Sequence, residues 1–416
     1  MKYKINNSNL DRILTHRFWG LLIFLAVIWI MFFCTFKIGS YPQQWIEILM
    51  GKLSIITENS IKSEWLSDFI QNGIINGIGS VLTFLPNILI LFFFISLLQE
   101  TEYLPRAARL MDKYMHGIGL HGSSFIPLLM GFGCNIPAIM ATRTIERKND
   151  RILTIMMIPY IPCSARIPTF LLFSGIFFPE NSILVMMLLY IGGLLTGVVM
   201  ALINKRLFFN EKKEDYVIEL PELRAPSLLK SLKSMWDAAA EYLKKIGTIV
   251  LVAVIIIWAL DYFPLKSKEN VDSERMSYLQ QFGHTIEPAM KPLGFDWKMS
   301  TSLITGITAK EFIVSTLGVL YKEDEHLVSE APPLSLRIKQ ETYTYGDKIG
   351  EKVFNKANAL SFMIFALLYI PCVATALTIR KESGSWKWSI LSICTTLLIA
   401  WVLSFAAYRV GLLLWN

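Results

Sequence analysis

The sequence predicts an all-α integral membrane protein, a polytopic helical bundle of two repeats with broken or re-entrant helices. Hydrophobic residues make up 53% of the 416 positions and charged residues only 18%, a composition that suits a bilayer better than a soluble domain. The tetrapeptide Tyr-Ile-Pro-Cys occurs twice, at 160–163 and 369–372, each time inside a membrane-length apolar stretch. Because proline frees carbonyl oxygens there, both breaks are expected to lie within protein or along a polar cavity.

The chain divides into four segments. Residues 1–79 contain a first span, at 18–36, followed by an amphipathic segment for the outer face. Basic residues precede this span, which indicates a cytoplasmic N-terminus. Residues 80–203 are the first repeat, 204–246 are a cytoplasmic amphipathic segment, and 247–416 are the second repeat.

In the first repeat, a span at 80–98 precedes an apolar stretch at 123–142 that prolines and glycines interrupt. Basic loops flank that stretch on both sides, so we expect a re-entrant hairpin entered from the cytoplasm. Two further spans, at 152–178 and 183–203, follow with a very short turn between them. The cytoplasmic segment then contains an amphipathic helix that starts after Pro226.

The sequence is compatible with two membrane topologies for the second repeat. Its apolar stretch at 300–321 contains Lys310 and Glu311. If this stretch spans fully, the C-terminus is cytoplasmic; if it is a second re-entrant hairpin, entered from outside, the basic turn at 380–387 becomes cytoplasmic. We favour the hairpin, because it makes the two Tyr-Ile-Pro-Cys helices antiparallel, the inverted repeat typical of secondary transporters. The plain spans of this repeat are 247–262, 357–379 and 388–413.

A seven-residue motif, Gly-Phe-Gly-Cys-Asn-Ile-Pro at 131–137, packs flexible backbone and ligating side chains together. Its glycines let the backbone approach an ion, its cysteine offers sulfur, and its asparagine and freed carbonyls offer oxygen. A tight turn with a buried, inert cysteine is an equally open reading. The candidate metal ligands are Cys134 and Asn135, and the candidate pathway residues are Gly131, Gly133 and Pro137.

Both Tyr-Ile-Pro-Cys motifs place a thiol beside a helix break, and a thiol indicates a borderline or soft cation. Arg166 and Thr375 stand three residues after the two cysteines and so share their helix faces. An arginine in an apolar run needs a carboxylate or carbonyl partner, and a structural ion pair is an equally open reading. Cys163 and Cys372 join the candidate metal ligands, and Pro162, Ser164, Pro371 and Thr375 join the pathway residues.

Glu311 is the one carboxylate deep in a membrane-length run, which makes it a candidate cation ligand. Neutralisation by Lys310 is the alternative, but adjacent residues of a helix point about 100° apart. Cys34 and Cys394 have no helix breaker nearby and are interpreted as packing. Because all five cysteines lie in apolar runs, we expect no extracellular disulfide framework.

Several function classes do not fit. The sequence has no Gly-x-x-x-x-Gly-Lys-[Ser/Thr] loop, and no His-Glu-x-x-His or Ser-His-Asp constellation on a plausible scaffold, so we expect no enzyme. The net charge of +7 is spread over loops. It indicates membrane topology and contact with the lipid bilayer rather than a nucleic-acid partner.

Residues 82–94, 121–144, 294–297 and 384–388 resemble the membrane domain of the bacterial ferrous iron transport protein B family. The Gly-Phe-Gly-Cys-Asn motif is the most specific of these signals. The resemblance implies two gate repeats in a multi-pass protein of the bacterial cytoplasmic (inner) membrane, with Fe²⁺ as the transported ion. It also implies Cys134, Cys163 and Cys372 as pathway ligands.

Proteins of this family usually begin with a cytoplasmic GTP-binding domain. This chain starts at the position where that domain would end and the membrane part would begin. The resemblance therefore implies a GTPase partner, as a removed domain or a separate subunit, with GTP bound only there. It also implies a small accessory protein as a partner and is compatible with a homo-oligomer. It implies no covalently bound cofactor. Where the family pattern reads Glu-Asp-Thr-Gly-Tyr, this chain has Gln-Glu-Thr-Glu-Tyr at 99–103, so the first carboxylate is missing.

The leading hypothesis is a ferrous-iron permease core with a thiol- and carbonyl-lined path, controlled by a GTPase. On ligand type alone, Mn²⁺ and Zn²⁺ fit as well. One alternative is a gate-repeat transporter for another solute, such as a nucleoside, with the cysteines as packing. Another is a membrane scaffold that does not transport.

Overall fold

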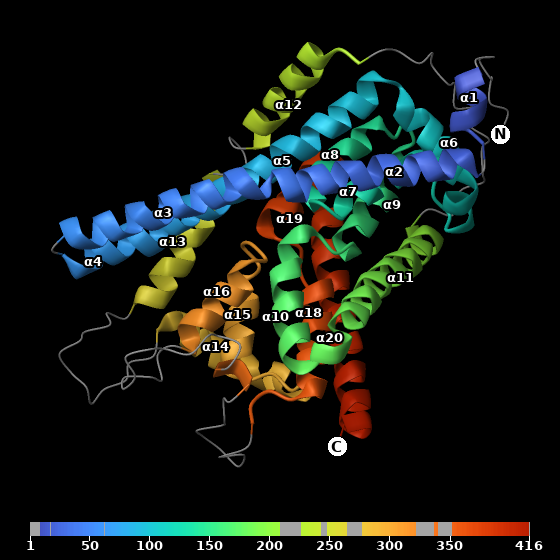
Figure 1. Cartoon of the computed structure of the whole chain (residues 1–416). Helices are drawn as coiled ribbons and strands as arrows, with labels where there is room; N and C mark the ends of the chain where they lie inside the picture. Colours follow the sequence, from blue (N-terminus) through green and yellow to red (C-terminus); the bar gives the residue numbers. More distant parts are fainter. Residues whose placement is uncertain are drawn as a thin grey trace. The chain divides into compact units, whose positions relative to one another are not determined.

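The computed structural model describes residues 9–16, 18–61, 63–208, 226–242, 248–263, 277–321, 337–339 and 352–415. The regular elements in these ranges are all helices (Figure 1), which confirms the all-α class. Contacts group the chain into two units, residues 1–158 with 198–255 and residues 159–197 with 256–416. These units are defined by contacts between residues and not by the sequence repeats. They therefore do not test the four predicted segments, which stay a prediction.

The first unit is built around the long helix α5. Both α3 and α12 pack along α5, and α6 packs on α7. The predicted amphipathic helix after Pro226 is present as α12. The elements of this unit are α1 (Asn9–Leu14), α2 (Trp19–Phe33), η1 (Cys34–Ile38), α3 (Ser40–Ser60), α4 (Glu64–Asp68), η2 (Phe69–Ile75), α5 (Asn76–Glu100), α6 (Tyr103–Gly117), η3 (Gly122–Ser124), α7 (Phe125–Gly131), α8 (Asn135–Ala141), η4 (Thr142–Thr144), α9 (Lys148–Met157) and α12 (Leu228–Tyr242).

The second unit is organised by the antiparallel neighbours α18 and α20, with α10 also packed on α18. Its elements are η6 (Ser164–Arg166), α10 (Ile167–Phe177), η7 (Pro179–Asn181), α14 (Tyr278–Met290), η9 (Lys291–Leu293), α15 (Trp297–Thr305), α16 (Phe312–Leu320), α18 (Lys356–Leu368), α19 (Val373–Ser383) and α20 (Trp386–Trp415). Three elements have residues in both units: η5 (Ile158–Tyr160), α11 (Ser182–Phe208) and α13 (Thr248–Tyr262).

Four helical runs are long and apolar enough to cross a membrane: Lys148–Phe177, Pro179–Phe208, Lys356–Ser383 and Trp386–Trp415. They coincide with four of the predicted spans, at 152–178, 183–203, 357–379 and 388–413, the first of which ends one residue earlier than predicted. The predicted span at 80–98 lies within α5, whose last part meets α6 at an angle of 89°. The spans predicted at 18–36 and 247–262 coincide with shorter apolar helices, α2 and α13.

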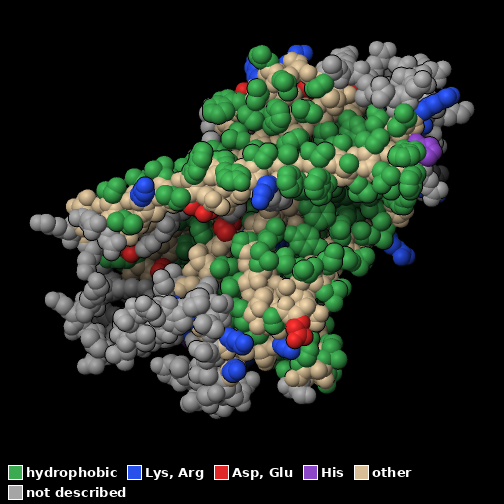
Figure 2. Space-filling view, viewed as in Figure 1, with side chains coloured by type: hydrophobic (Ala, Val, Ile, Leu, Met, Phe, Trp, Pro, Cys, Tyr) green, Lys and Arg blue, Asp and Glu red, His purple; other side chains and the backbone are tan. Residues whose placement is uncertain are grey.

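Apolar side chains cover much of the outer surface of these helices. The face shown in Figure 2 is largely hydrophobic, including the surface of α2. In water such a surface would associate or aggregate, whereas in lipid it is the stable arrangement. The protein is therefore a multi-pass membrane protein. Exposed examples are Trp19, Leu22, Leu25 and Trp29 on α2 and Ile183, Leu184, Met187, Leu188 and Ile191 on α11.

Each repeat contains a pair of short helices joined by a turn. In the first repeat α7 packs on α8, and in the second α15 packs on α16. Each of the latter two has nine residues, which is about 14 Å of helix against a hydrocarbon core of about 30 Å. The stretch at 300–321 is therefore a helical hairpin rather than one full span. The inverted relation of the two repeats stays a prediction.

Within each repeat the elements then follow in the same order. The hairpin is followed by a span broken at Tyr-Ile-Pro-Cys, and the broken span by a continuous one. Asp296 begins α15 as its N-cap, accepting a hydrogen bond of 2.8 Å from the backbone N–H of Met299. Asn355 begins α18 with a reciprocal capping box. These caps fix where the helices of the second repeat start.

The bend after α5 is made by Glu102, the one non-glycine residue with a positive φ (57°) among those the structure describes. This is the position at which the family pattern has glycine. A left-handed residue after a helix is usually glycine, because a side chain costs about 1–2 kcal/mol there. The fully buried Arg106 holds the bend by donating from Nη1 to the Glu102 carbonyl oxygen at 2.6 Å.

We expect Glu102→Gly to raise the free energy of unfolding by up to about 1 kcal/mol, because relief of the left-handed strain exceeds the added unfolded-state entropy. Thermal unfolding in detergent measures this. The control Glu100→Gly, within the last turn of α5, should lower stability by about 1 kcal/mol. Equal destabilisation by both changes would show that Glu102 is not strained.

Candidate functional site

The first break lies between η5 and η6. Helical structure ends at Tyr160 and resumes at Ser164, with Pro162 buried and Cys163 extended between them. Gly193 of α11 lies against this turn, because a side chain there would meet the Tyr160 carbonyl oxygen at 2.9 Å. A glycine at this point lets α11 pack directly on broken backbone.

Arg166 lies beside the first break and is 1% exposed. Its Nη2 donates to the carbonyl oxygen of Pro159 at 3.4 Å, so its partner is a carbonyl and not a carboxylate. Its Nε and Nη1 are buried and have no hydrogen-bond partner in the described part of the chain. The first break therefore contains a buried guanidinium with unused donors.

The second break separates α18 from α19. Tyr369 ends α18 in extended conformation, Pro371 is buried, and Cys372 is the N-cap of α19. The sulfur of Cys372 lies 3.0 Å from Oγ1 of Thr375. The residue three positions after this cysteine therefore lies beside it.

The turn between α15 and α16 is attached to the second break at two points. The backbone N–H of Val373 donates to the Ile307 carbonyl oxygen at 3.0 Å. Nζ of Lys310 donates to the Ile370 carbonyl oxygen at 2.6 Å and lies 3.4 Å from the centre of the Tyr369 ring. The hairpin of the second repeat thus supplies one acceptor, the Ile307 carbonyl oxygen, and one donor, Nζ of Lys310, to the broken backbone.

Glu311 is half-buried and comes directly before α16. It lies in the turn rather than in a helix. The angle of about 100° between adjacent helical residues, by which Lys310 and Glu311 are expected to point apart, therefore does not apply to it. Within the described ranges, no ion pair joins Glu311 to Lys310 or Arg166. Gly306 of the same turn lies against the Tyr369 hydroxyl, which connects this turn with the Cys372 break.

The two breaks lie near one another within the second unit. Cys163 interacts electrostatically with Arg166, Cys372 and Lys310, and both cysteines are half-buried. The structure therefore brings two thiols and two buried cations together. Among the residues it describes, no three His, Cys, Asp or Glu side chains converge closely enough to hold a metal ion, and the predicted ligand set stays a prediction.

The remaining predicted ligands lie in the first unit, in the turn between α7 and α8. Cys134 is half-buried and extended as the N-cap of α8. Asn135 is 5% exposed, and its Oδ1 is buried without a hydrogen-bond partner in the described ranges. A side chain at Gly133 would meet Leu91 of α5 at 3.0 Å, so this turn packs closely on α5. Gly131 and Pro137 are buried on either side.

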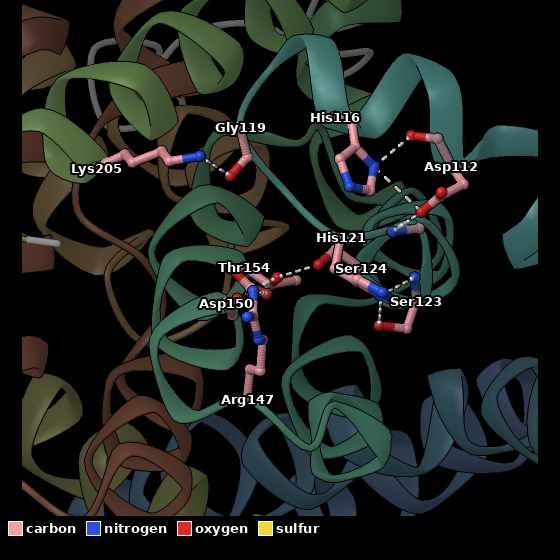
Figure 3. A network of polar contacts seen from close by, with 11 residues as sticks. Asp112, His116, Gly119, His121, Ser123, Ser124, Arg147, Asp150, Thr154 and Lys205 are labelled. Atoms are coloured by element: carbon pink, nitrogen blue, oxygen red, sulfur yellow. Dashed lines mark hydrogen bonds and ion pairs between the residues drawn. The ribbon is translucent and has the colours of Figure 1, made fainter. Parts of the chain in front are cut away.

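A polar network in the first unit was not anticipated from the sequence (Figure 3). Asp112 of α6 accepts from the backbone N–H of Gly122 at 2.9 Å and pairs with Nδ1 of His116 at 3.2 Å. His121 bonds Ser123 through Nδ1 at 2.9 Å, and its Nε2 is buried without a partner in the described residues. The network anchors the start of the first hairpin on α6. The spacing of its residues along the sequence gives no motif that could have revealed it.

Two family models match the chain. One, a gate-domain model described as nucleoside recognition, matches residues 81–177 and 243–386. The other, described as the ferrous iron transport protein B C terminus, matches residues 186–237. No solved structure matches the chain.

Curated relatives match nearly all of this chain. A Porphyromonas gingivalis protein named Fe(2+) transport protein A/Fe(2+) transporter FeoB fusion protein is 42% identical over 99% of this chain and 52% of its own length. The Fe(2+) transporter FeoB of Staphylococcus aureus is 38% identical over 97% and 59%, and that of Campylobacter jejuni 39% over 98% and 66%. The chain thus spans between half and two thirds of these relatives' length.

Burial lowers the pKa of His121 below its ordinary value of 6.5, although the Asp112 and Asp150 carboxylates oppose this shift. The unfolded chain then binds the proton more tightly, so stability is lost as the pH falls from about 6.5 through the folded-state pKa. We expect the melting temperature to drop over this range in wild type and to drop less in His121→Gln. A wild-type slope in His121→Gln would show that His121 does not cause this pH dependence.

Proposed function

Because the chain belongs to the gate-domain family, in the group of the ferrous iron transport protein B, we propose that it is a permease core that carries Fe²⁺ across a membrane. Its relatives are named Fe(2+) transporters. The observation that carries the proposal is the pair of half-buried thiols, Cys163 and Cys372, at two neighbouring breaks in membrane-length helices. Broken spans of this kind surround substrate sites in secondary transporters.

The donor types at the breaks suit a borderline divalent cation. Thiols and freed carbonyl oxygens together select such ions over hard monovalent ones. Within the first unit, Asn135 offers a separate buried amide oxygen that has no hydrogen-bond partner among the described residues. At a site of this kind we expect the ion to bind transiently, because conduction requires that it can leave as well as enter. Gly131, Gly133, Pro137, Pro162, Ser164, Pro371 and Thr375 shape the turns that expose these donors.

The partners belong to the same proposal. The matched relatives extend well beyond this chain, and the family resemblance assigns a GTP-binding domain to the remainder. We infer that a GTPase, in the same or a separate polypeptide, controls opening from the cytoplasm and that the membrane is the bacterial inner membrane. The name of the Porphyromonas relative joins Fe(2+) transport protein A to the transporter, which supports a small accessory protein.

A second candidate substrate follows from the description of the matching gate-domain model, nucleoside recognition. A nucleoside carrier would use the broken helices for hydrogen bonds to base and ribose, with the cysteines as packing. Uptake into proteoliposomes separates the two: anaerobic Fe²⁺ accumulation supports the iron permease, and uridine accumulation without Fe²⁺ accumulation supports the nucleoside carrier.

We expect Cys163→Ser and Cys372→Ser each to reduce Fe²⁺ uptake about tenfold, because serine keeps the approximate volume but is a poor ligand for a borderline cation, and a loss of about 1.4 kcal/mol gives this factor. Uptake of ⁵⁵Fe²⁺ into proteoliposomes measures the effect. Cys394→Ser is the matched control, since this cysteine is exposed on α20. Normal uptake by both variants, or equal loss of folded protein, would support the packing interpretation.

We expect Glu311→Gln to weaken the apparent affinity for Fe²⁺ at least tenfold with little change in folding. One anionic ligand near a divalent ion contributes several kcal/mol at an effective dielectric constant of about 20, and glutamine preserves the shape without the charge. Concentration dependence of uptake measures this. An unchanged half-saturating concentration would remove Glu311 from the pathway.

A further inference from the structure

The ammonium group of Lys310 occupies the second break. Lys310 is 3% exposed, donates from Nζ to the Ile370 carbonyl oxygen at 2.6 Å and lies 3.4 Å from the centre of the Tyr369 ring. Carbonyl oxygens and aromatic faces are neutral groups that bind cations in proteins. The break therefore has the character of a cation site, and a cation of the chain itself fills it.

This site exists because the helix is interrupted. Ile370 lies between the end of α18 and the start of α19, directly before Pro371. The first N–H of α19, on Val373, bonds to Ile307 of the hairpin turn. The turn thus holds one side of the break with a neutral hydrogen bond and the other with the charge of Lys310.

The carboxylate of the adjacent Glu311 attracts this charge. Among the described residues Lys310 forms no ion pair with Glu311, and its other charged neighbour is Arg166, a second buried cation. A buried ammonium is costly unless its surroundings satisfy it, and the groups that do so here are the Ile370 carbonyl and the Tyr369 ring. Any second cation that reaches this break is repelled while Lys310 remains.

We propose that Lys310 is a tethered cation that closes the path by occupying the carbonyl and aromatic site at the second break, and that the transported cation must displace it. This inference rests on the proposed transport function and names the residue that keeps the path selective. A tethered group acts at an effective concentration of millimolar or more. A monovalent ion has no charge advantage over the ammonium, whereas a divalent ion has twice its Coulomb attraction for the carbonyl and nearby thiols.

The direct test is leakage of a monovalent cation through protein in which the ammonium is missing. Proteoliposomes holding a thallium-sensitive dye report Tl⁺ entry without any Fe²⁺. We expect Lys310→Met to raise the rate of Tl⁺ entry at least tenfold over wild type, because methionine fills the space but leaves the cation site vacant. Lys310→Arg should stay closed, since it restores a cation.

Lys298→Met is the matched control. Lys298 belongs to α15, is 9% exposed and lies 4.7 Å from the centre of the Tyr321 ring, so it is also a buried lysine over an aromatic face, but it is remote from either break in sequence. It should remain as tight to Tl⁺ as wild type. Equal tightness of Lys310→Met, in protein with the wild-type melting temperature, would overturn the proposal.

A measurement on unaltered protein covers the case in which Lys310→Met does not fold. Acetic anhydride labels accessible lysines, and peptide mass spectrometry gives the extent at each one. We expect labelling of Lys310 to rise at least threefold when anaerobic Fe²⁺ is present, with no change at Lys298. Labelling of Lys310 that Fe²⁺ leaves unchanged would contradict displacement.

The two assays separate this inference from the proposed function. If wild type takes up Fe²⁺ but Lys310→Met does not leak, the permease stands and the tethered cation fails. If wild type takes up no Fe²⁺ while Lys310→Met leaks Tl⁺, the closing role of Lys310 stands and Fe²⁺ as the substrate fails.

Discussion

A proline in a membrane helix leaves carbonyl oxygens without donors, and in hydrocarbon only the protein can satisfy them. Much of the second unit follows from this requirement. At the first break Arg166 donates to Pro159, and at the second the turn between α15 and α16 donates through Lys310. That turn joins two helices of nine residues each, α15 and α16. The broken backbone thus places two buried cations beside two thiols.

This arrangement has a consequence for transport. A site rich in thiols and carbonyls attracts cations, while fixed positive charge beside it repels them, so entry depends on exchange rather than on simple attraction. Under the proposed control by a GTPase, that partner acts by shifting the balance between the state closed by Lys310 and the state open to the ion.

Sequence reasoning found the features that depend on local pattern and length. The four long spans follow from apolar runs and the first hairpin from glycine and proline interruptions. The second hairpin follows from the basic turn at 380–387 and the repeated motif, and α12 from its helical periodicity. It missed features set by tertiary contact. The basic stretch after residue 98, predicted as a loop, is helix α6, because Arg106 is buried on the bend at Glu102. From the sequence, Lys310 is interpreted only as an alternative partner that would neutralise Glu311. No local pattern indicates that its side chain reaches a backbone carbonyl 60 residues away.

The central claim is that the two Tyr-Ile-Pro-Cys breaks line one cation path. Its most direct test is intramolecular cross-linking of Cys163 to Cys372 with a short bismaleimide, in membranes containing protein whose other three cysteines are serine. The account predicts a linked peptide pair in mass spectrometry and protection from linking by anaerobic Fe²⁺ but not by Mg²⁺, a hard cation that thiols bind poorly. Failure to link the two cysteines, or linking that Fe²⁺ does not affect, would contradict it.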